Sequence, residues 1–141
     1  MRVPARILAI DYGKKRIGLA VSDPLGIAAH GLDTLFRTRL REDLETLAAI
    51  VDQREVELIL FGNPLRLDGT DSAASGSVRR FAHQLQRRTG RPVEFWDERL
   101  TSFEAEQLLR EMQIPTGRHT GNLDRMAAML LLRSYLEARS A

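Results

Sequence analysis

One stretch of this chain, residues 7–23, restricts the possible folds more than any other. An apolar run ends on Asp11, a glycine and three cations follow, and a second apolar run leaves the turn. This pattern predicts two antiparallel strands joined as a hairpin, the first carrying a carboxylate at its carboxyl end. Gly13 allows a tight turn, and Gly18 leaves room on the second strand for another group to approach. A lone aspartate at a strand end is also common for turn reasons alone, so Asp11 indicates a site only if other acids join it.

The rest of the chain alternates between apolar strands and amphipathic helices. Further strands are predicted over 26–36, 57–62 and 93–97, and helices over 39–54, 72–89, 101–112 and 123–138. Asn63 is expected to break the fourth strand and to begin a loop that reaches Asp71. Three hairpin-connected strands followed by βα units predict an α/β fold with a mixed five-stranded sheet. Its spatial order is 3-2-1-4-5, antiparallel through the first three strands and parallel beyond them, with helices on both faces.

Length and composition narrow the class of protein. A chain of 141 residues, 43% hydrophobic and 28% charged, is typical of one globular domain, here expected over 1–141. No apolar run approaches the roughly 18 residues of a membrane span, and the N-terminus lacks a signal-peptide core. The absence of cysteine excludes thiolate metal sites and fits a cytoplasmic protein. With three scattered histidines, any metal is expected on oxygen ligands, which favours Mg²⁺ or Mn²⁺.

The cations are clustered although the net charge is only +2. All but two of the 21 are arginine, the side chain suited to bidentate phosphate contacts. They gather at 14–16, 37–41, 79–91 and 118–119. Any one cluster could equally be a solvated surface, so arginine abundance alone does not identify a nucleic-acid-binding protein.

Acidic residues fall where the predicted fold brings distant segments together. Asp11 ends the first strand, Asp97 and Glu98 end the fifth, and Asp124 begins the last helix. Parallel strands deliver their carboxyl ends to one edge of the sheet, where ligands bind in open α/β folds. Converging carboxylates repel one another unless cations neutralise them, and two divalent ions about 3.5–4 Å apart would clamp the oxygens of a phosphoryl displacement. Taken singly, the same acids could be a surface ion-pair cluster or a helix-dipole partner.

These motifs resemble those of the YqgF/RuvX family. The resemblance is carried by Asp11-Tyr12-Gly13 with residues 15–23, Gly62-Asn63-Pro64-Leu65 with Asp68-Gly69-Thr70, residues 97–101, and Gly121 with Asp124 and Ala127-Ala128. It covers almost the whole chain, with the four motifs in the family's order and spacing. It implies an RNase H-like nuclease of a family described as Holliday-junction resolvase homologues and implicated in maturing the ends of the small-subunit ribosomal RNA precursor.

The resemblance also implies roles for individual residues. It makes Asp11, Glu98 and Asp124 the catalytic and metal-binding acids, holding Mg²⁺ or Mn²⁺. Asp97 is the alternative to Glu98, because adjacent strand residues point to opposite faces and at most one of them enters the site. The implied nucleic-acid-binding residues are Lys15, Arg16 and Arg99, which would face phosphate, together with Thr101, which is either a helix cap or a further phosphate contact.

Two positions depart from the family pattern. Asn63 stands where an apolar residue is common, and His119-Thr120 replaces a lysine often found just before Gly121. The second change removes the lysine that would supply a cation directly beside Asp124. Arg118 or Arg125 could substitute for it.

The function predicted from the resemblance is divalent-metal-dependent hydrolysis of phosphodiester bonds in structured RNA or branched DNA. It would serve 5′-end maturation of the ribosomal RNA precursor, Holliday-junction resolution, or both. The first alternative is a non-catalytic nucleic-acid-binding module on the same fold. The second is an actin-like ATPase or sugar kinase, which shares the first motif but needs two such domains. No membrane partner is expected, and the residues favour neither RNA nor DNA, and neither a monomer nor a weak homodimer.

Overall fold

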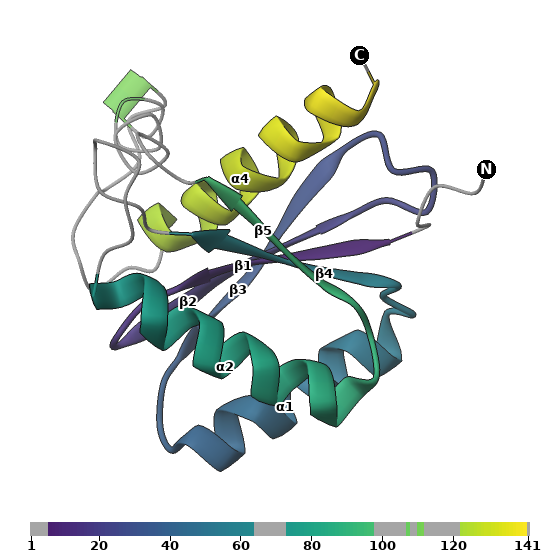
Figure 1. Ribbon diagram of the computed structural model, residues 1–141. Coiled ribbons are helices and arrows are strands. Elements are labelled where there is room, and N and C mark those ends of the chain that lie inside the picture. Colours follow the sequence, from purple (N-terminus) through teal and green to yellow (C-terminus); the bar gives the residue numbers. More distant parts are fainter. Residues whose placement is uncertain (1–5, 64–72, 98–106, 108–109, 112–121, 141) are drawn as a thin grey trace.

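The computed structural model describes residues 6–63, 73–97, 107, 110–111 and 122–140 (Figure 1). Its strands are β1 (Ile7–Tyr12), β2 (Arg16–Ser22), β3 (Ala29–Phe36), β4 (Leu58–Asn63) and β5 (Val93–Asp97). They form one sheet in the order β3-β2-β1-β4-β5. The pairs β1–β2 and β2–β3 are antiparallel, whereas β1–β4 and β4–β5 are parallel. The predicted order and strand directions are confirmed.

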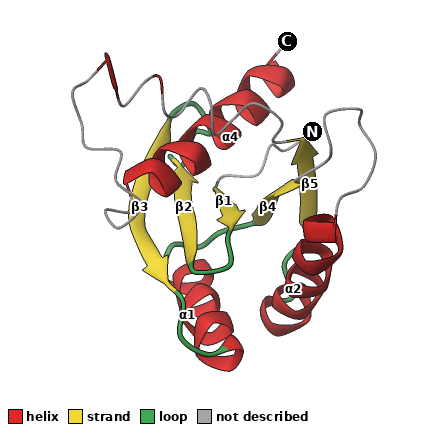
Figure 2. Cartoon of the chain, turned by 90° about the vertical axis from the view of Figure 1, so that its left-hand side faces the viewer, coloured by secondary structure: helices red, strands yellow, loops and turns green. Residues whose placement is uncertain are grey.

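Helices cover both faces of this sheet, as predicted. The helices are α1 (Leu40–Gln53), α2 (Ala73–Thr89) and α4 (Asn122–Ser140). Figure 2 shows α1 and α2 on one face and α4 on the other, which we call the α1/α2 face and the α4 face. Of the helix expected over 101–112, only residues 107, 110 and 111 are described, and they are helical. Among the described residues, no helix combines the length and the apolar character that a bilayer span requires.

Several element boundaries differ from the prediction. Asn63 is the last residue of β4 rather than the start of a loop, since it pairs with Asp97 and its Oδ1 accepts a hydrogen bond from Ser75 Oγ at 2.6 Å. The third strand begins at Ala29 rather than at residue 26, because the Asp23 carboxylate accepts the backbone N–H groups of Ile27 and Ala28 in a turn. The final helix also extends beyond the predicted range at both ends.

The two faces enclose separate cores. The core on the α1/α2 face contains Leu8, Ile10, Ile17, Leu19, Val21, Leu44, Leu47, Val51, Val56, Ile59, Phe61, Val78, Phe81, Ala82 and Leu85. The core on the α4 face contains Ile7, Ala9, Ala20, Leu58, Leu60, Ala128, Leu131, Leu132, Tyr135 and Leu136. Leu40, the first residue of α1, is 45% exposed.

Candidate active site

Asp11 lies on the α4 face at the carboxyl end of β1. Along this strand Ile10 belongs to the core of the α1/α2 face, whereas Ile7 and Ala9 pack in the core under α4. Side chains alternate along a strand, so Asp11 shares the face of Ile7 and Ala9. The residue is half-buried and pairs in register with Gly18 of β2.

The start of α4 contacts the sheet at Gly18. A Cβ atom added there would lie 2.0 Å from the carbonyl oxygen of Asp124 and 3.2 Å from its Cα. The backbone of the first turn of α4 therefore lies directly on the strand, where no side chain intervenes. Because Gly18 is the cross-strand partner of Asp11, this contact brings Asp124 beside Asp11. The prediction that Gly18 leaves room for another group is confirmed, and the group is the backbone of Asp124.

Arg16, the first residue of β2, forms an ion pair with Asp124. Its Nε donates to Asp124 Oδ2 at 2.7 Å, and the two side chains are 23% and 22% exposed. The Nε of Arg16 is thus a counter-ion for the acid on α4, and the expected contact of this residue with nucleic acid stays a prediction. Lys15, the residue before it, is exposed in the turn.

A second arginine holds this turn from the end of β3. Arg37 donates from Nη1 to the Gly13 carbonyl at 3.1 Å and from its backbone N–H to the Lys15 carbonyl at 2.9 Å. Its guanidinium lies over the Tyr12 ring, 4.6 Å from the centroid, and its Nε donates to Asp43 Oδ2 at 3.1 Å. Asp43 is 1% exposed. Arg37 thus links the turn that carries Lys15 to the buried Asp43. The sequence showed Arg37 only as one member of a basic cluster, because its contacts depend on where the end of β3 lies.

The two faces separate the side chains of β5. Val93 packs against the core of the α1/α2 face, and the Phe95 ring lies 6.1 Å from that of Phe61. On the other side, Trp96 packs in the core under α4. Alternation therefore places Asp97 with Val93 and Phe95, on the face opposite Asp11. Of the adjacent acids, Asp97 is not brought to the Asp11 face.

The remaining predicted residues have different outcomes. Glu98, Arg99 and Thr101 lie outside the described residues, as do Arg118 and His119-Thr120. Arg125 does not take the place of a cation beside Asp124. Its Nε donates to the Leu32 carbonyl at 3.0 Å and its Nη2 contacts Asp33 at 3.3 Å, so it holds α4 to β3.

The donor set at this edge fits a hard divalent cation. Within the described ranges no group of three potential metal ligands occurs, and the third expected acid, Glu98, lies outside them. Asp11 and Asp124 nevertheless supply carboxylate oxygens on one face, the ligand type that Mg²⁺ and Mn²⁺ prefer.

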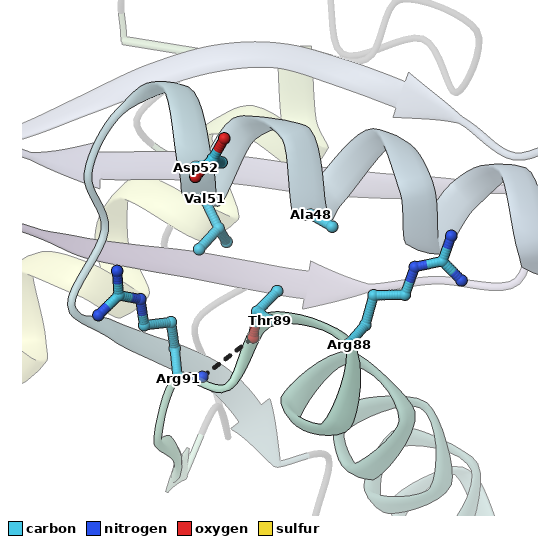
Figure 3. Close-up of a pocket in the computed structure, with 6 residues that line it drawn as sticks. All are labelled: Ala48, Val51, Asp52, Arg88, Thr89 and Arg91. Carbon is cyan, nitrogen blue, oxygen red and sulfur yellow. Dashed lines mark hydrogen bonds between the residues drawn. The ribbon is translucent and has the colours of Figure 1, made fainter.

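A pocket of about 180 Å³ lies elsewhere, between α1 and α2 (Figure 3). It is lined by Ala48, Val51, Asp52, Arg88, Thr89 and Arg91. These residues belong to the carboxyl-terminal part of α1 and to the end of α2 with the residues after it, whereas Asp11 is on the other face of the sheet. Arg88 is already paired with Glu45 at 2.9 Å. This pocket belongs to the packing of the two helices rather than to the acidic site.

Comparison with known proteins supports the fold. The structure resembles "T. thermophilus RuvC in complex with Holliday junction substrate", with a TM-score of 0.62, 16% identity, and coverage of 96% of this chain and 95% of that one. It also resembles a Fowlpox virus resolvase bound to Holliday junction DNA, with a TM-score of 0.62, 10% identity, and coverage of 96% and 99%. At such identities the likeness concerns the fold, which is the expected RNase H-like fold.

Sequence similarity supplies the family. A protein of Koribacter versatilis named "Putative pre-16S rRNA nuclease" is 47% identical over 137 residues, which are 97% of this chain and 90% of that protein. A protein of Syntrophus aciditrophicus with the same name is 47% identical over 135 residues, 96% of this chain and 90% of that protein. The family model described as "RuvX: Holliday junction resolvase" matches residues 5–138. The chain therefore belongs to the RuvX (YqgF) family.

Proposed function

We propose that this chain is a nuclease that hydrolyses phosphodiester bonds in nucleic acid with divalent metal ions held at the carboxyl edge of the sheet. The observation that carries this proposal is the contact of Gly18 with Asp124, which sets a helix acid beside the strand acid Asp11. The names of the relatives support the small-subunit ribosomal RNA precursor as substrate, and the description of the family supports branched DNA as a second candidate.

Asp11, Asp124 and Glu98 are the proposed ligands of Mg²⁺ or Mn²⁺. Asp97 lies on the opposite face from Asp11, which favours Glu98 as the third acid. When bound, two such ions supply the Lewis acidity that activates a water molecule and stabilises the leaving oxygen. The protein's own contribution is to hold the acids in place before substrate arrives.

The basic residues of the turn position the substrate in this proposal. Arg16 orients the Asp124 carboxylate through its Nε, and a guanidinium has further donors on its two Nη atoms that suit a phosphate. Lys15 is exposed beside it and offers a mobile charge to the next phosphate. Arg99 and Thr101 are proposed as further contacts to nucleic acid.

The test is cleavage by wild type and by Asp11→Asn. Labelled single-stranded RNA, precursor ribosomal RNA spanning the 5′ end of the small-subunit sequence, and a four-way DNA junction are incubated with Mg²⁺, Mn²⁺ or EDTA. Asp11→Asn keeps the shape of the side chain and removes its charge, so cleavage is expected to fall below detection while the melting temperature stays close to that of wild type. Asp52→Asn is the matched control, because Asp52 is an exposed acid at the end of α1.

Cleavage by Asp11→Asn at the wild-type rate would overturn the proposal. If wild type binds these substrates in every condition and cuts none of them, the chain is a binding module on the same fold. The preferred substrate among those cut decides between precursor RNA and junction DNA.

A further inference from the structure

An exposed aromatic residue ends the strand β3. Phe36 is 54% exposed, although Leu35 immediately before it packs against the core of the α1/α2 face. β3 is the outer strand of the sheet on this side, so no further strand covers it in the described part of the chain (Figure 2). Internal packing therefore does not account for the position of this ring.

Phe36 faces the same side as the proposed site. It pairs in register with Arg16, and cross-strand partners place their side chains on one face of a sheet. Arg16 reaches Asp124 on the α4 face, so Phe36 lies on that face too. Two strand spacings and two residues of strand rise separate Phe36 from Asp11, which puts their Cα atoms roughly 12 Å apart.

Basic residues follow Phe36 in the chain and lie in the neighbouring β1–β2 turn. Lys14 and Lys15 are exposed in the β1–β2 turn, and Arg39 is exposed just before α1. The hydrogen bond from the Arg37 N–H to the Lys15 carbonyl holds the two basic segments together around the end of β3. An exposed ring among cations is the arrangement that binds single-stranded nucleic acid, since cations follow the backbone and the ring stacks on a base.

We propose that Phe36 is a stacking site for an unpaired nucleobase near the nucleotide that is cut, so that the chain selects single-stranded nucleic acid beside the cut. This inference rests on the proposed nuclease function for its orientation, because the phosphate to be cut is taken to lie at Asp11 and Asp124. Bases in a duplex already stack on their neighbours and offer no free face to Phe36, whereas an unpaired base does. The separation from Asp11 assigns the stacked base to a neighbouring nucleotide.

The experiment measures binding in EDTA, so that cleavage does not interfere. The probes are a single-stranded RNA oligonucleotide carrying the fluorescent base 2-aminopurine and the duplex of the same sequence. The proteins are wild type, Phe36→Ala, Phe36→Trp and Phe95→Ala. Phe95 is the matched control, because it is also a partly exposed phenylalanine, 38% exposed, but it lies on the α1/α2 face of the opposite edge strand.

Phe36→Ala is expected to weaken single-strand binding about tenfold, the order of effect that follows loss of a stacked aromatic side chain. Duplex binding is expected to change by less than about twofold, because phosphate contacts alone support it. Phe36→Trp should keep the affinity and show fluorescence quenching by the single strand beyond the signal of Trp96 seen in wild type. Phe95→Ala should match wild type on both probes.

Wild-type single-strand affinity in Phe36→Ala would overturn the inference. Equal weakening for single strand and duplex would overturn it as well, since that result would mean that Phe36 supports the basic turn rather than a base. Cleavage by wild type in Mg²⁺ is measured alongside. If wild type cuts and Phe36→Ala binds the single strand normally, the stacking proposal is rejected and the nuclease proposal stands. If wild type does not cut but Phe36→Ala loses single-strand binding, the nuclease proposal fails and the stacking site stands.

Discussion

Helices α1 and α2 rest on large side chains, whereas the start of α4 rests on glycine and alanine residues of β2 and β3, although Ile7, Leu58 and Leu60 contribute to the same core. The core under α1 and α2 is built mainly from leucine, isoleucine, valine and phenylalanine, and in it the rings of Phe61 and Phe81 meet edge to face. Under α4 the strands present Ala9, Ala20, Gly18 and Gly31. The small residues let α4 lie close enough for its backbone to touch β2 and for the Arg125 side chain to cross Gly31.

The difference in side-chain size between the two faces means that one face contributes more to the stability of the fold, whereas the other determines the position of the candidate site. Large buried side chains contribute most of the hydrophobic free energy, about 25 cal/mol for each Å² of apolar surface removed from water. Small residues contribute little of this free energy, but they decide how near a helix approaches the sheet. Asp11 and Asp124 both lie on the face with the small residues, so the site depends on the part of the molecule that contributes less to its core.

The largest loss of stability is expected from Phe61→Ala, which tests the face with large side chains. Phe61 is fully buried between the rings of Phe81 and Phe95, and its loss leaves a cavity that costs about 3–5 kcal/mol. Urea unfolding measures this loss. Cleavage per folded molecule should remain near that of wild type, because the acids lie on the other face. A fall in cleavage beyond the unfolded fraction would mean that the two faces are coupled.

Gly18→Ala tests the face with small side chains and should give the opposite pattern. The added methyl group would meet the Asp124 carbonyl oxygen, so the start of α4 must move. We expect a loss of about 1–3 kcal/mol from overpacking, together with at least tenfold slower cleavage. Urea unfolding and cleavage rates are measured on one preparation.

The control for this substitution is Gly76→Ala in α2. The nearest atom to its added methyl group is the flexible end of Arg80, at 3.4 Å. Alanine in a helix should raise stability by about 0.5–1 kcal/mol without changing cleavage. Wild-type cleavage in Gly18→Ala would show that the contact with α4 does not position Asp124.

The smallest loss of stability is expected from Tyr135→Phe in the last part of α4. Desolvation in the packing between α4 and β5 raises the pKa of the Tyr135 hydroxyl, and its hydrogen bond to Glu94 raises it further. A phenol with a raised pKa in the folded state stabilises the fold below its ordinary pKa of 10.0, and this contribution is lost as pH rises above that value.

At neutral pH Tyr135→Phe should cost about 1 kcal/mol, the usual net value of one hydrogen bond. The variant should also lose less stability than wild type between pH 9 and pH 11, measured by urea unfolding. Parallel pH profiles for the two proteins would contradict the assignment of this dependence to Tyr135.

The strand order was predictable because the sequence contains features that indicate which strands are neighbours. Two short turns give the antiparallel pairs, and the apolar run of β4 needs a buried place beside β1. The boundaries were less predictable. Asn63 has the composition of a turn residue, but Ser75, twelve residues later, donates to its side chain and it remains in the ladder of β4.

Part of the candidate site's geometry could also be predicted, namely the place of Asp11 near the carboxyl end of β1 and the approach of another group to Gly18. Strand parity predicted that at most one of Asp97 and Glu98 enters the site, and the described part of β5 places Asp97 on the other face. The pairing of Arg16 with Asp124 could not be predicted, because 108 residues separate them and only the seating of α4 brings them together. The edge position of β3 was part of the predicted order, but the face that Phe36 takes was not predictable, because β3 changes register between the partners of Ile17 and Leu19.

The contact between Gly18 and Asp124 also restricts how this chain can diverge. A side chain at Gly18 could not be accommodated by repacking its neighbours, because the atom it would meet is a backbone oxygen. A second substitution that lifted α4 would make room, but it would withdraw Asp124 from Asp11. We therefore expect few substitutions to be tolerated at Gly18, although glycine supplies no functional group. The reason is the one that applies to the acids: a change would remove Asp124 from its place beside Asp11.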